Sequence, residues 1–277
     1  MTKYDFVGDG DSDFRPDKPV TPWESYANHR GIVTGFIKSI CLSSARSLCV
    51  LGAGYCFDID LKHLLDEFDE IALVDISQTD IDYGLAEQNV SRETTIETLS
   101  GFDVTGVDSL MDKYATQPTE SLLEEILASL GRGNVELPKH YDCIASTCLL
   151  SQLLYKATSC IGESHERFVE VLQAVRLSHI RLLVDSLNKG GTGILFTDFV
   201  SSDSLPELLN TDDLEATLQS AIVEKNFLHG LNPPMVAKVF EHPDVRDELT
   251  GIKVTDPWRW VTGDKVYACF AIVFHKK

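Results

Sequence analysis

Two glycines and an aspartate in the first third of the chain have types and a spacing suited to binding a ligand. The segment Gly52-Ala53-Gly54 directly follows an apolar run at residues 48–51, and Asp75 ends the next apolar run, at residues 71–74. Glycine lets the backbone come close to a ligand and adopt conformations that other residues avoid. Each oxygen of the Asp75 carboxylate can accept a hydrogen bond from one of two vicinal ribose hydroxyls. These residues therefore predict a site for a cofactor that contains adenosine.

The same residues also have a plainer explanation, in which the glycines form a tight turn and Asp75 caps the next helix. If the loop binds a cofactor, two classes of cofactor share this arrangement. The dinucleotide fingerprint G-x-G-x-x-G needs a third glycine where this chain has Phe57. No tyrosine of the chain is followed four residues later by a lysine, which excludes one large group of single-domain dehydrogenases. An NAD(P)-dependent oxidoreductase therefore stays as an alternative, and another adenosine cofactor is favoured.

The elements that must position these residues alternate along the chain. Short apolar runs predict strands at residues 48–51, 71–74, 95–99, 141–145 and 194–196. Helical spacing of apolar residues predicts helices near residues 21–40, 61–68, 79–88, 122–130, 164–187 and 213–225. Thr21 and Glu24 suit a capping box at the first helix, and Gly190 and Gly191 are expected to end the helix at 164–187. Two last strands, at 258–261 and 265–275, are expected to form a hairpin around Gly263-Asp264.

This order predicts an α/β fold: a doubly wound, mostly parallel seven-stranded sheet with a C-terminal antiparallel hairpin and helices on both faces. In such sheets, ligands bind at the carboxyl ends of the strands near the topological switch point. Residues 1–44 are expected to be a flexible segment and a helix that caps the cofactor. Residues 45–277 are expected to form the cofactor-binding domain, with a helical insertion at 108–140 that shapes the acceptor pocket.

Three motifs resemble those of the class I S-adenosylmethionine-dependent methyltransferases, a Rossmann-like family. They are Val50-Leu51-Gly52-Ala53-Gly54, Ile71-Ala72-Leu73-Val74-Asp75-Ile76 and Tyr141-Asp142-Cys143-Ile144-Ala145-Ser146, and the closing hairpin completes the resemblance over residues 45–277. The resemblance implies S-adenosylmethionine as cofactor and methyl transfer to a small molecule or a protein side chain. A protein that binds the cofactor without catalysis is a further alternative.

The resemblance also implies roles for individual residues. Gly52, Ala53, Gly54 and Tyr55 would lie beside the methionine end of the cofactor, Asp75 would hold the ribose, and Ile76 would also contact the cofactor. Asp103 would contact adenine, with Phe102 packing beside it, and Ser146, Thr147 and Cys148 would face the methyl group. The chain departs from the family at Val50, where an acid is common, and at Cys56, where a third glycine is common. Asp58 or Asp60 would supply the missing contact to the methionine amino group, and helix capping is the alternative for both.

Candidates for catalysis are few, because methyl transfer from a sulfonium is mainly a matter of positioning. Asp198 follows the fifth predicted strand and is a candidate base, with a cap as the alternative. Tyr26 and Arg30 could close over the cofactor, or could belong to a solvated helix face. Cys148 could be a nucleophile, although packing in the core is favoured. The histidines show neither HxxxH nor HxH spacing, so no metal site is predicted.

The overall composition limits the partners. The formal net charge of −19 disfavours nucleic acid and anionic membranes. The longest apolar stretch, at residues 266–274, is too short for a membrane-spanning helix. The seven cysteines form no CxxC pair, and most of them, Cys143 included, lie in apolar segments, so we expect free thiols in a reducing compartment. A cytoplasmic location is therefore predicted.

Overall fold

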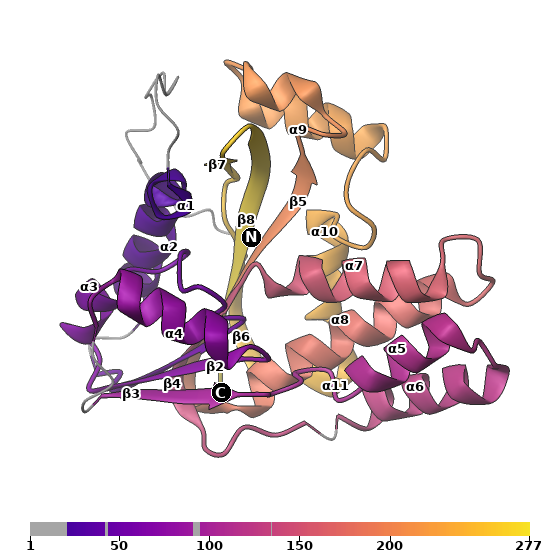
Figure 1. Cartoon of the computed structure of the whole chain (residues 1–277), viewed down its shortest axis with the longest axis horizontal. Coiled ribbons are helices and arrows are strands. Elements are labelled where there is room, and N and C mark those ends of the chain that lie inside the picture. Colours follow the sequence, from indigo (N-terminus) through magenta and orange to yellow (C-terminus); the bar gives the residue numbers. More distant parts are fainter. Residues whose placement is uncertain (1–20, 42–43, 91–94, 134) are drawn as a thin grey trace.

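Short apolar segments form one eight-stranded sheet in the computed structural model, which describes residues 21–41, 44–90, 95–133 and 135–277 (Figure 1). The strand order is β3-β2-β1-β4-β5-β8-β6, and β7 pairs with β8 outside this path. The strands are β1 (Ser47–Leu51), β2 (Glu70–Asp75), β3 (Ile96–Ser100), β4 (Tyr141–Thr147), β5 (Leu187–Ser201), β6 (Leu249–Val254), β7 (Trp258–Thr262) and β8 (Lys265–Lys276).

The five strands from β1 to β5 are parallel, whereas β8 runs antiparallel to β5, β6 and β7. The predicted mostly parallel sheet with a closing hairpin is confirmed, and Gly263 takes a positive φ of 61° in the hairpin turn, as a two-residue loop requires. The sheet has one strand more than the seven predicted. The extra strand is β6, whose apolar alternation is interrupted at Gly251, where φ is 65° and the register shifts.

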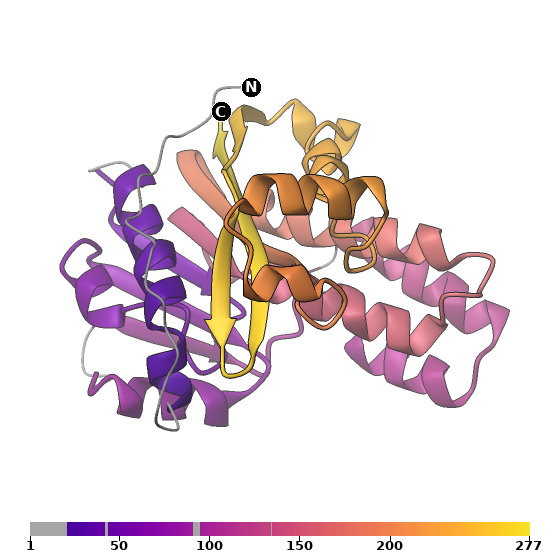
Figure 2. The ribbon, with the colours of Figure 1, turned by 90° about the horizontal axis from the view of Figure 1, so that it is seen from above.

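Helices cover both faces of the sheet, as predicted (Figures 1 and 2). They are α1 (Pro22–Ser25), α2 (Ala27–Ile40), α3 (Leu61–Leu65), α4 (Gln78–Glu87), α5 (Asp108–Thr116), α6 (Glu120–Arg132), α7 (Leu149–Ile161), α8 (Phe168–Asp185), α9 (Leu214–Val223), α10 (Pro233–Val239) and α11 (Pro243–Arg246), with a 3-10 helix, η1 (Pro206–Leu209). Alternate residues of β1 face the two layers: Leu48 and Val50 pack with α2 and α3, and Cys49 and Leu51 pack with α7 and α8.

The end of the longest helix differs from the sequence prediction. Helix α8 ends at Asp185 with Ser186 as its cap, and β5 already begins at Leu187. Gly190 therefore lies within the strand, where φ is 74° and the pairing with β4 is irregular, rather than in a helix cap. The reason is that the apolar Leu187 pairs with Tyr141 and extends the strand toward its start. Helix α7, between β4 and α8, had not been predicted.

The two segments assigned outside the central sheet are both helical where the structure describes them. The capping box at Thr21 and Glu24 starts α1 as predicted, and the flexible segment expected before it lies outside the described residues. The 108–140 insertion forms α5 and α6, which pack against α7 and α8 (Figure 1). Among the described helices, none has the length and apolar character needed to cross a membrane.

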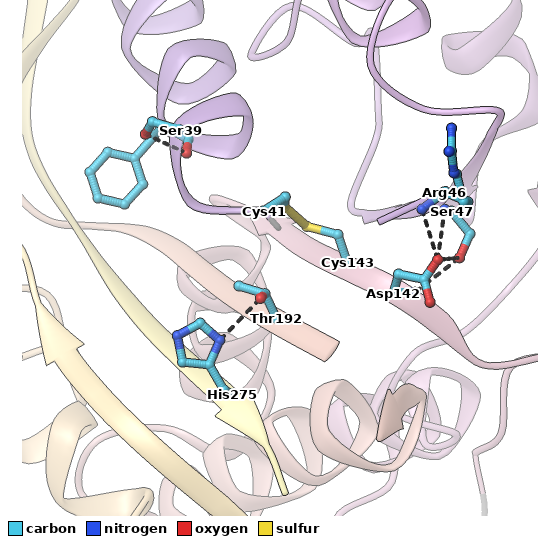
Figure 3. Close-up of a disulfide and its surroundings, with 9 residues drawn as sticks. Ser39, Cys41, Arg46, Ser47, Asp142, Cys143, Thr192 and His275 are labelled. Atoms are coloured by element: carbon cyan, nitrogen blue, oxygen red, sulfur yellow. Dashed lines mark hydrogen bonds between the residues drawn. A yellow bond between two sulfur atoms is a disulfide. The ribbon is translucent and has the colours of Figure 1, made fainter. Parts of the chain in front are cut away.

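A disulfide corrects the prediction that Cys143 is a free thiol. Cys41, directly after α2, is joined to Cys143 in β4 across 102 residues of chain (Figure 3). Beside it, the Asp142 carboxylate accepts hydrogen bonds from the backbone N–H groups of Arg46 and Ser47 at 2.8 and 3.1 Å. The bond and these contacts attach the end of α2 and the start of β1 to β4. The spacing of the cysteines gave no signal for this pair, because the two come together only through the fold.

Candidate functional site

The glycine loop follows β1 as predicted and lies against β2 and α7. The N–H groups of Gly52 and Ala53 both donate to the Val74 carbonyl, at 3.0 and 3.1 Å. Gly52 has a φ of 74°, and a Cβ at this position would lie 2.7 Å from the Cβ of Leu149. Gly52 therefore meets two requirements that other residues do not: a left-handed backbone conformation and close approach to α7.

Asp75 lies at the carboxyl end of β2 and holds the loop from the other side. Its Oδ2 accepts the Gly54 N–H at 2.8 Å, and its Oδ1 accepts the Ser77 N–H at 2.9 Å. An ionised carboxylate can accept about four hydrogen bonds. Each of the two oxygens can therefore accept one further hydrogen bond, and two vicinal hydroxyls would donate one to each. Asp75 is half-buried, so these positions are within reach of a ligand.

Beyond Asp75, the loop and α4 present apolar side chains to solvent. Tyr55 is 49% exposed and Ile76 is 58% exposed, and the Tyr55 ring packs edge-on against Tyr83 with centroids 5.6 Å apart. The loop comes so close to α4 that a Cβ at Gly84 would lie 2.1 Å from the Tyr55 carbonyl oxygen. Gly84 was not predicted as part of the site, and an isolated glycine inside a predicted helix was its signal.

Ser146 and Thr147, predicted to face the methyl group, have buried side chains. The Ser146 hydroxyl bonds to His179 Nε2 of α8 at 2.9 Å, and the Thr147 hydroxyl donates to the Gly52 carbonyl at 3.1 Å. Burial lowers the pKa of His179 to about 4, so its ring is neutral. These two hydroxyls therefore stabilise the ends of β1 and β4 from inside the core.

Asp103 lies near Asp75 but uses its carboxylate locally. Oδ1 accepts from the N–H and hydroxyl of Thr105, and Oδ2 accepts from the Asp108 N–H at 2.8 Å, at the start of α5. The Phe102 N–H donates to the Asp75 carbonyl at 3.3 Å, which brings this loop beside the end of β2. The loop thus lies beside the end of β2, and the Asp103 carboxylate accepts hydrogen bonds within its own turn.

The N-terminal helices are fastened to the chain after the glycine loop. The Arg30 guanidinium lies over the Trp23 ring at 3.3 Å and donates to the carbonyls of Trp23 and Phe57. Tyr26 packs edge-on against Phe57 and Trp260, with centroids 5.5 and 4.9 Å apart. Phe57, which stands in place of the third fingerprint glycine, is therefore an anchor for α1 and α2. Tyr26 and Arg30 are brought to the site, and the Arg30 donors are partly committed to backbone.

A second group of polar side chains lies under these helices. Asp58 Oδ1 is 3.0 Å from His29 Nε2, and the Cys148 Sγ is 4.0 Å from the same nitrogen. The other ring nitrogen of His29, Nδ1, accepts the Trp258 indole N–H at 3.2 Å. Asp60, in contrast, caps α3 through the His63 N–H at 3.1 Å. His29 was not predicted, because its partners come from three separate segments and no short spacing marks them.

Asp198 lies beside this group within β5. It is almost fully buried and accepts the Ser151 hydroxyl of α7 at 2.5 Å. Burial raises the pKa of the Asp198 carboxyl. Two cavities, of about 190 and 430 Å³, lie elsewhere, beside Asp142 and beside Cys41. Neither of them is lined by a residue of the predicted cofactor site.

Comparison with known proteins finds no matching family model and no matching curated protein sequence. Solved structures of S-adenosylmethionine-dependent methyltransferases are similar to this chain. The N-methyltransferase NodS from Bradyrhizobium japonicum WM9, in complex with S-adenosyl-L-homocysteine, has a TM-score of 0.46 and 12% sequence identity, over 92% of this chain and 88% of that chain.

Two others are similar at the same level. Magnesium protoporphyrin IX methyltransferase from Synechocystis PCC 6803, with bound S-adenosyl-L-homocysteine, has a TM-score of 0.47 and 10% identity, over 91% of this chain and 83% of that chain. An S-adenosylmethionine-dependent methyltransferase from Methanosarcina mazei has a TM-score of 0.47 and 12% identity, over 87% of this chain and 96% of that chain.

The architecture implied by the sequence resemblance is present in this chain: parallel strands β1 to β5, helices on both faces and a closing antiparallel hairpin. The chain therefore has the predicted doubly wound α/β architecture. The loop and Asp75 lie at the carboxyl ends of β1 and β2, and the strand order reverses between β1 and β4. Ligands bind at such a switch point in open α/β sheets.

Proposed function

We propose that the chain is an S-adenosylmethionine-dependent methyltransferase that acts on a small molecule or a protein side chain. The observation that carries the proposal is the hydrogen bond from the Gly54 N–H to Asp75 Oδ2, 2.8 Å long. It brings the backbone of the glycine loop and a carboxylate with free acceptor positions to one edge of the sheet, beside the switch point.

The residues present fit an adenosine cofactor in that place. The loop from Gly52 to Tyr55 would lie along its methionine end, Asp75 would accept from the two ribose hydroxyls, and the exposed Ile76 would cover apolar ring surface. When bound, S-adenosylmethionine supplies an electrophilic methyl group on a sulfonium. The task of the protein is then to hold an acceptor atom about 3 Å from that methyl group and in line with it.

We assign the acceptor side to the carboxyl ends of β4 and β5, where Asp198 and the Tyr26 ring lie. A carboxyl whose pKa is raised by burial, as that of Asp198 is, takes up a proton more readily at neutral pH and suits a general base. Asp198 is the catalytic candidate on this ground, and its proton acceptor would be Oδ2, because Oδ1 accepts from Ser151.

Isothermal titration of the purified chain tests the proposal. Both S-adenosylmethionine and S-adenosylhomocysteine are expected to bind in the micromolar range, and NADH, followed by its fluorescence, is expected not to bind. Binding of NADH alone would instead identify a dinucleotide-dependent oxidoreductase. Failure of both sulfur compounds to bind at high micromolar concentration contradicts the proposal.

A cofactor-binding protein without catalysis is the second candidate, and the buried hydroxyls of Ser146 and Thr147 favour it. Both are bonded within the protein, to His179 and to the Gly52 carbonyl, and so do not line the surface where the methyl group would be. A screen of cell lysate with a labelled methyl donor separates the two. Label incorporated by the chain and lost in Asp198→Asn supports the enzyme, whereas cofactor binding with no incorporation supports the second candidate.

A further inference from the structure

His29, Asp58 and Cys148 bring three different metal-binding atoms together. The imidazole Nε2, the carboxylate oxygen and the thiol sulfur all lie within 4.8 Å of one another. Nε2 is 3.0 Å from Asp58 Oδ1 and 4.0 Å from Cys148 Sγ. His29 comes from α2, Asp58 from the segment between β1 and α3, and Cys148 from the junction of β4 and α7. Nitrogen, oxygen and sulfur ligands from separate segments are typical of zinc sites.

Two of the separations, 3.0 Å from His29 Nε2 to Asp58 Oδ1 and 4.0 Å from Nε2 to Cys148 Sγ, suit one ion in the middle. Zinc is bound at about 2.0 Å by imidazole or carboxylate and at about 2.3 Å by thiolate, in tetrahedral geometry. Ligand atoms around such an ion are therefore roughly 3 to 4 Å apart. Cys148 also has a φ of 48°, a conformation that side-chain-bearing residues seldom adopt. A conformation of this kind persists where the surroundings hold the residue in place, which occurs often at functional sites.

The surroundings of the three atoms favour a cation. Asp58 Oδ1 is buried and accepts no well-aligned hydrogen bond within the described residues. A second buried thiol, Cys269, packs against Cys148, and the Asp198 carboxylate lies within electrostatic range of both His29 and Asp58. The two carboxylates bring negative charge into a place poor in water, which costs free energy unless a positive charge, from a protonated His29 or a bound cation, compensates it.

We propose that His29, Asp58 and Cys148 bind one divalent transition-metal ion of the zinc class. The ion would join α2 to the ends of β1 and β4, and so would fix the N-terminal helices over the site. This proposal rests on the ligand geometry and the surrounding charge, and it stands whether or not the chain transfers methyl groups.

Binding has a consequence for Trp258. A metal ion on Nε2 leaves the proton of a neutral imidazole on Nδ1. The Trp258 indole N–H now donates to Nδ1 at 3.2 Å, and two N–H groups cannot form a hydrogen bond with each other. Loading with metal must therefore break this bond and change the surroundings of the indole. Trp258 fluorescence is thus a readout of the site that does not depend on enzyme activity.

The test is titration of the full chain, treated with chelator and then dialysed, with Co²⁺ and afterwards with Zn²⁺. We expect one equivalent of Co²⁺ to bind, a thiolate-to-cobalt absorption band in the near ultraviolet, a change in tryptophan fluorescence, and loss of the band when Zn²⁺ is added. Cys148→Ser should abolish the band and His29→Gln should weaken binding at least tenfold.

Matched controls are available in the same chain. Cys160→Ser removes a partly buried thiol from α7, about 18 Å along the helix from Cys148, and His63→Gln removes a histidine paired with Asp60 at the surface. Both should leave the titration unchanged. Asp58→Asn replaces a ligand with a group of the same size and serves if Cys148→Ser does not fold. Absence of stoichiometric binding, or equal binding by the ligand variants and the controls, overturns the proposal.

Discussion

Asp75 and Ser146 show what can and cannot be read from single residues. Asp75 ends an apolar run, and an acid at the end of a parallel strand has to lie at the edge where the glycine loop lies, so its place was predictable. Ser146 also lies near the end of a strand, but its hydroxyl is turned to His179 in the core. Which face of the sheet a strand residue occupies depends on register and on the helix that covers it, and neither is visible in the motif.

The buried His179 makes stability depend on pH. Its pKa of about 4 in the folded chain is below the usual value of 6.5, because burial disfavours the charged ring. Between these two pH values the unfolded chain therefore binds a proton that the folded chain does not. The free energy of unfolding is thus highest, as far as His179 is concerned, above pH 6.5, and it decreases as the pH falls toward 4. The loss is about 3 kcal/mol.

Urea unfolding from pH 7 to pH 4 measures this effect. His179→Gln, which cannot titrate, should lose less unfolding free energy over that range than the wild-type chain does. The surface variant His63→Gln should follow the wild-type curve. If His179→Gln followed it equally closely, His179 would not be the titrating group.

At the scale of elements, the strands with a clear end in the sequence, at Gly52, Asp75 or the Gly263-Asp264 turn, were easier to predict than the others. β1, β2 and the β7–β8 hairpin are apolar runs with clear ends. β6 is broken at Gly251, and α7 follows β4 after a single residue, Cys148, so neither has a separate boundary signal. The cluster around His29 forms where α2, the segment before α3 and the junction of β4 and α7 meet. Only the fold determines this meeting.

Packing between the glycine loop and α4 gives a prediction about an element contact. Gly84→Ala places a Cβ 2.1 Å from the Tyr55 carbonyl oxygen, which is backbone and cannot turn aside. We expect a loss of about 2 kcal/mol in unfolding free energy, with weaker cofactor binding because the loop must move. Gly31→Ala lies in α2, where an added Cβ would have no described neighbour outside the helix within 4 Å, and should be neutral or stabilising by up to about 1 kcal/mol. Equal stability of the two variants would show that the loop does not depend on Gly84.

For the whole molecule, the disulfide between Cys41 and Cys143 connects the N-terminal helices to the centre of the sheet (Figure 3). Closing a loop of 102 residues restricts the unfolded chain, and its removal is expected to cost about 3 kcal/mol. Cys41→Ser should therefore lower the melting temperature under oxidising conditions and make it insensitive to reductant. Cys160→Ser should keep the wild-type response to reductant. A wild-type melting temperature that does not change on reduction contradicts this contribution.

The central claim, that Asp75 and the glycine loop hold S-adenosylmethionine, is tested most directly by S-adenosylhomocysteine affinity in Asp75→Asn. The amide keeps the size of the side chain and one acceptor oxygen, but loses the charge and one of the two positions left for the ribose. We expect binding to weaken roughly tenfold to a hundredfold, while the matched change at the exposed Asp66 of the α3 cap leaves it unchanged. An affinity in Asp75→Asn equal to that of the Asp66→Asn control would contradict the account.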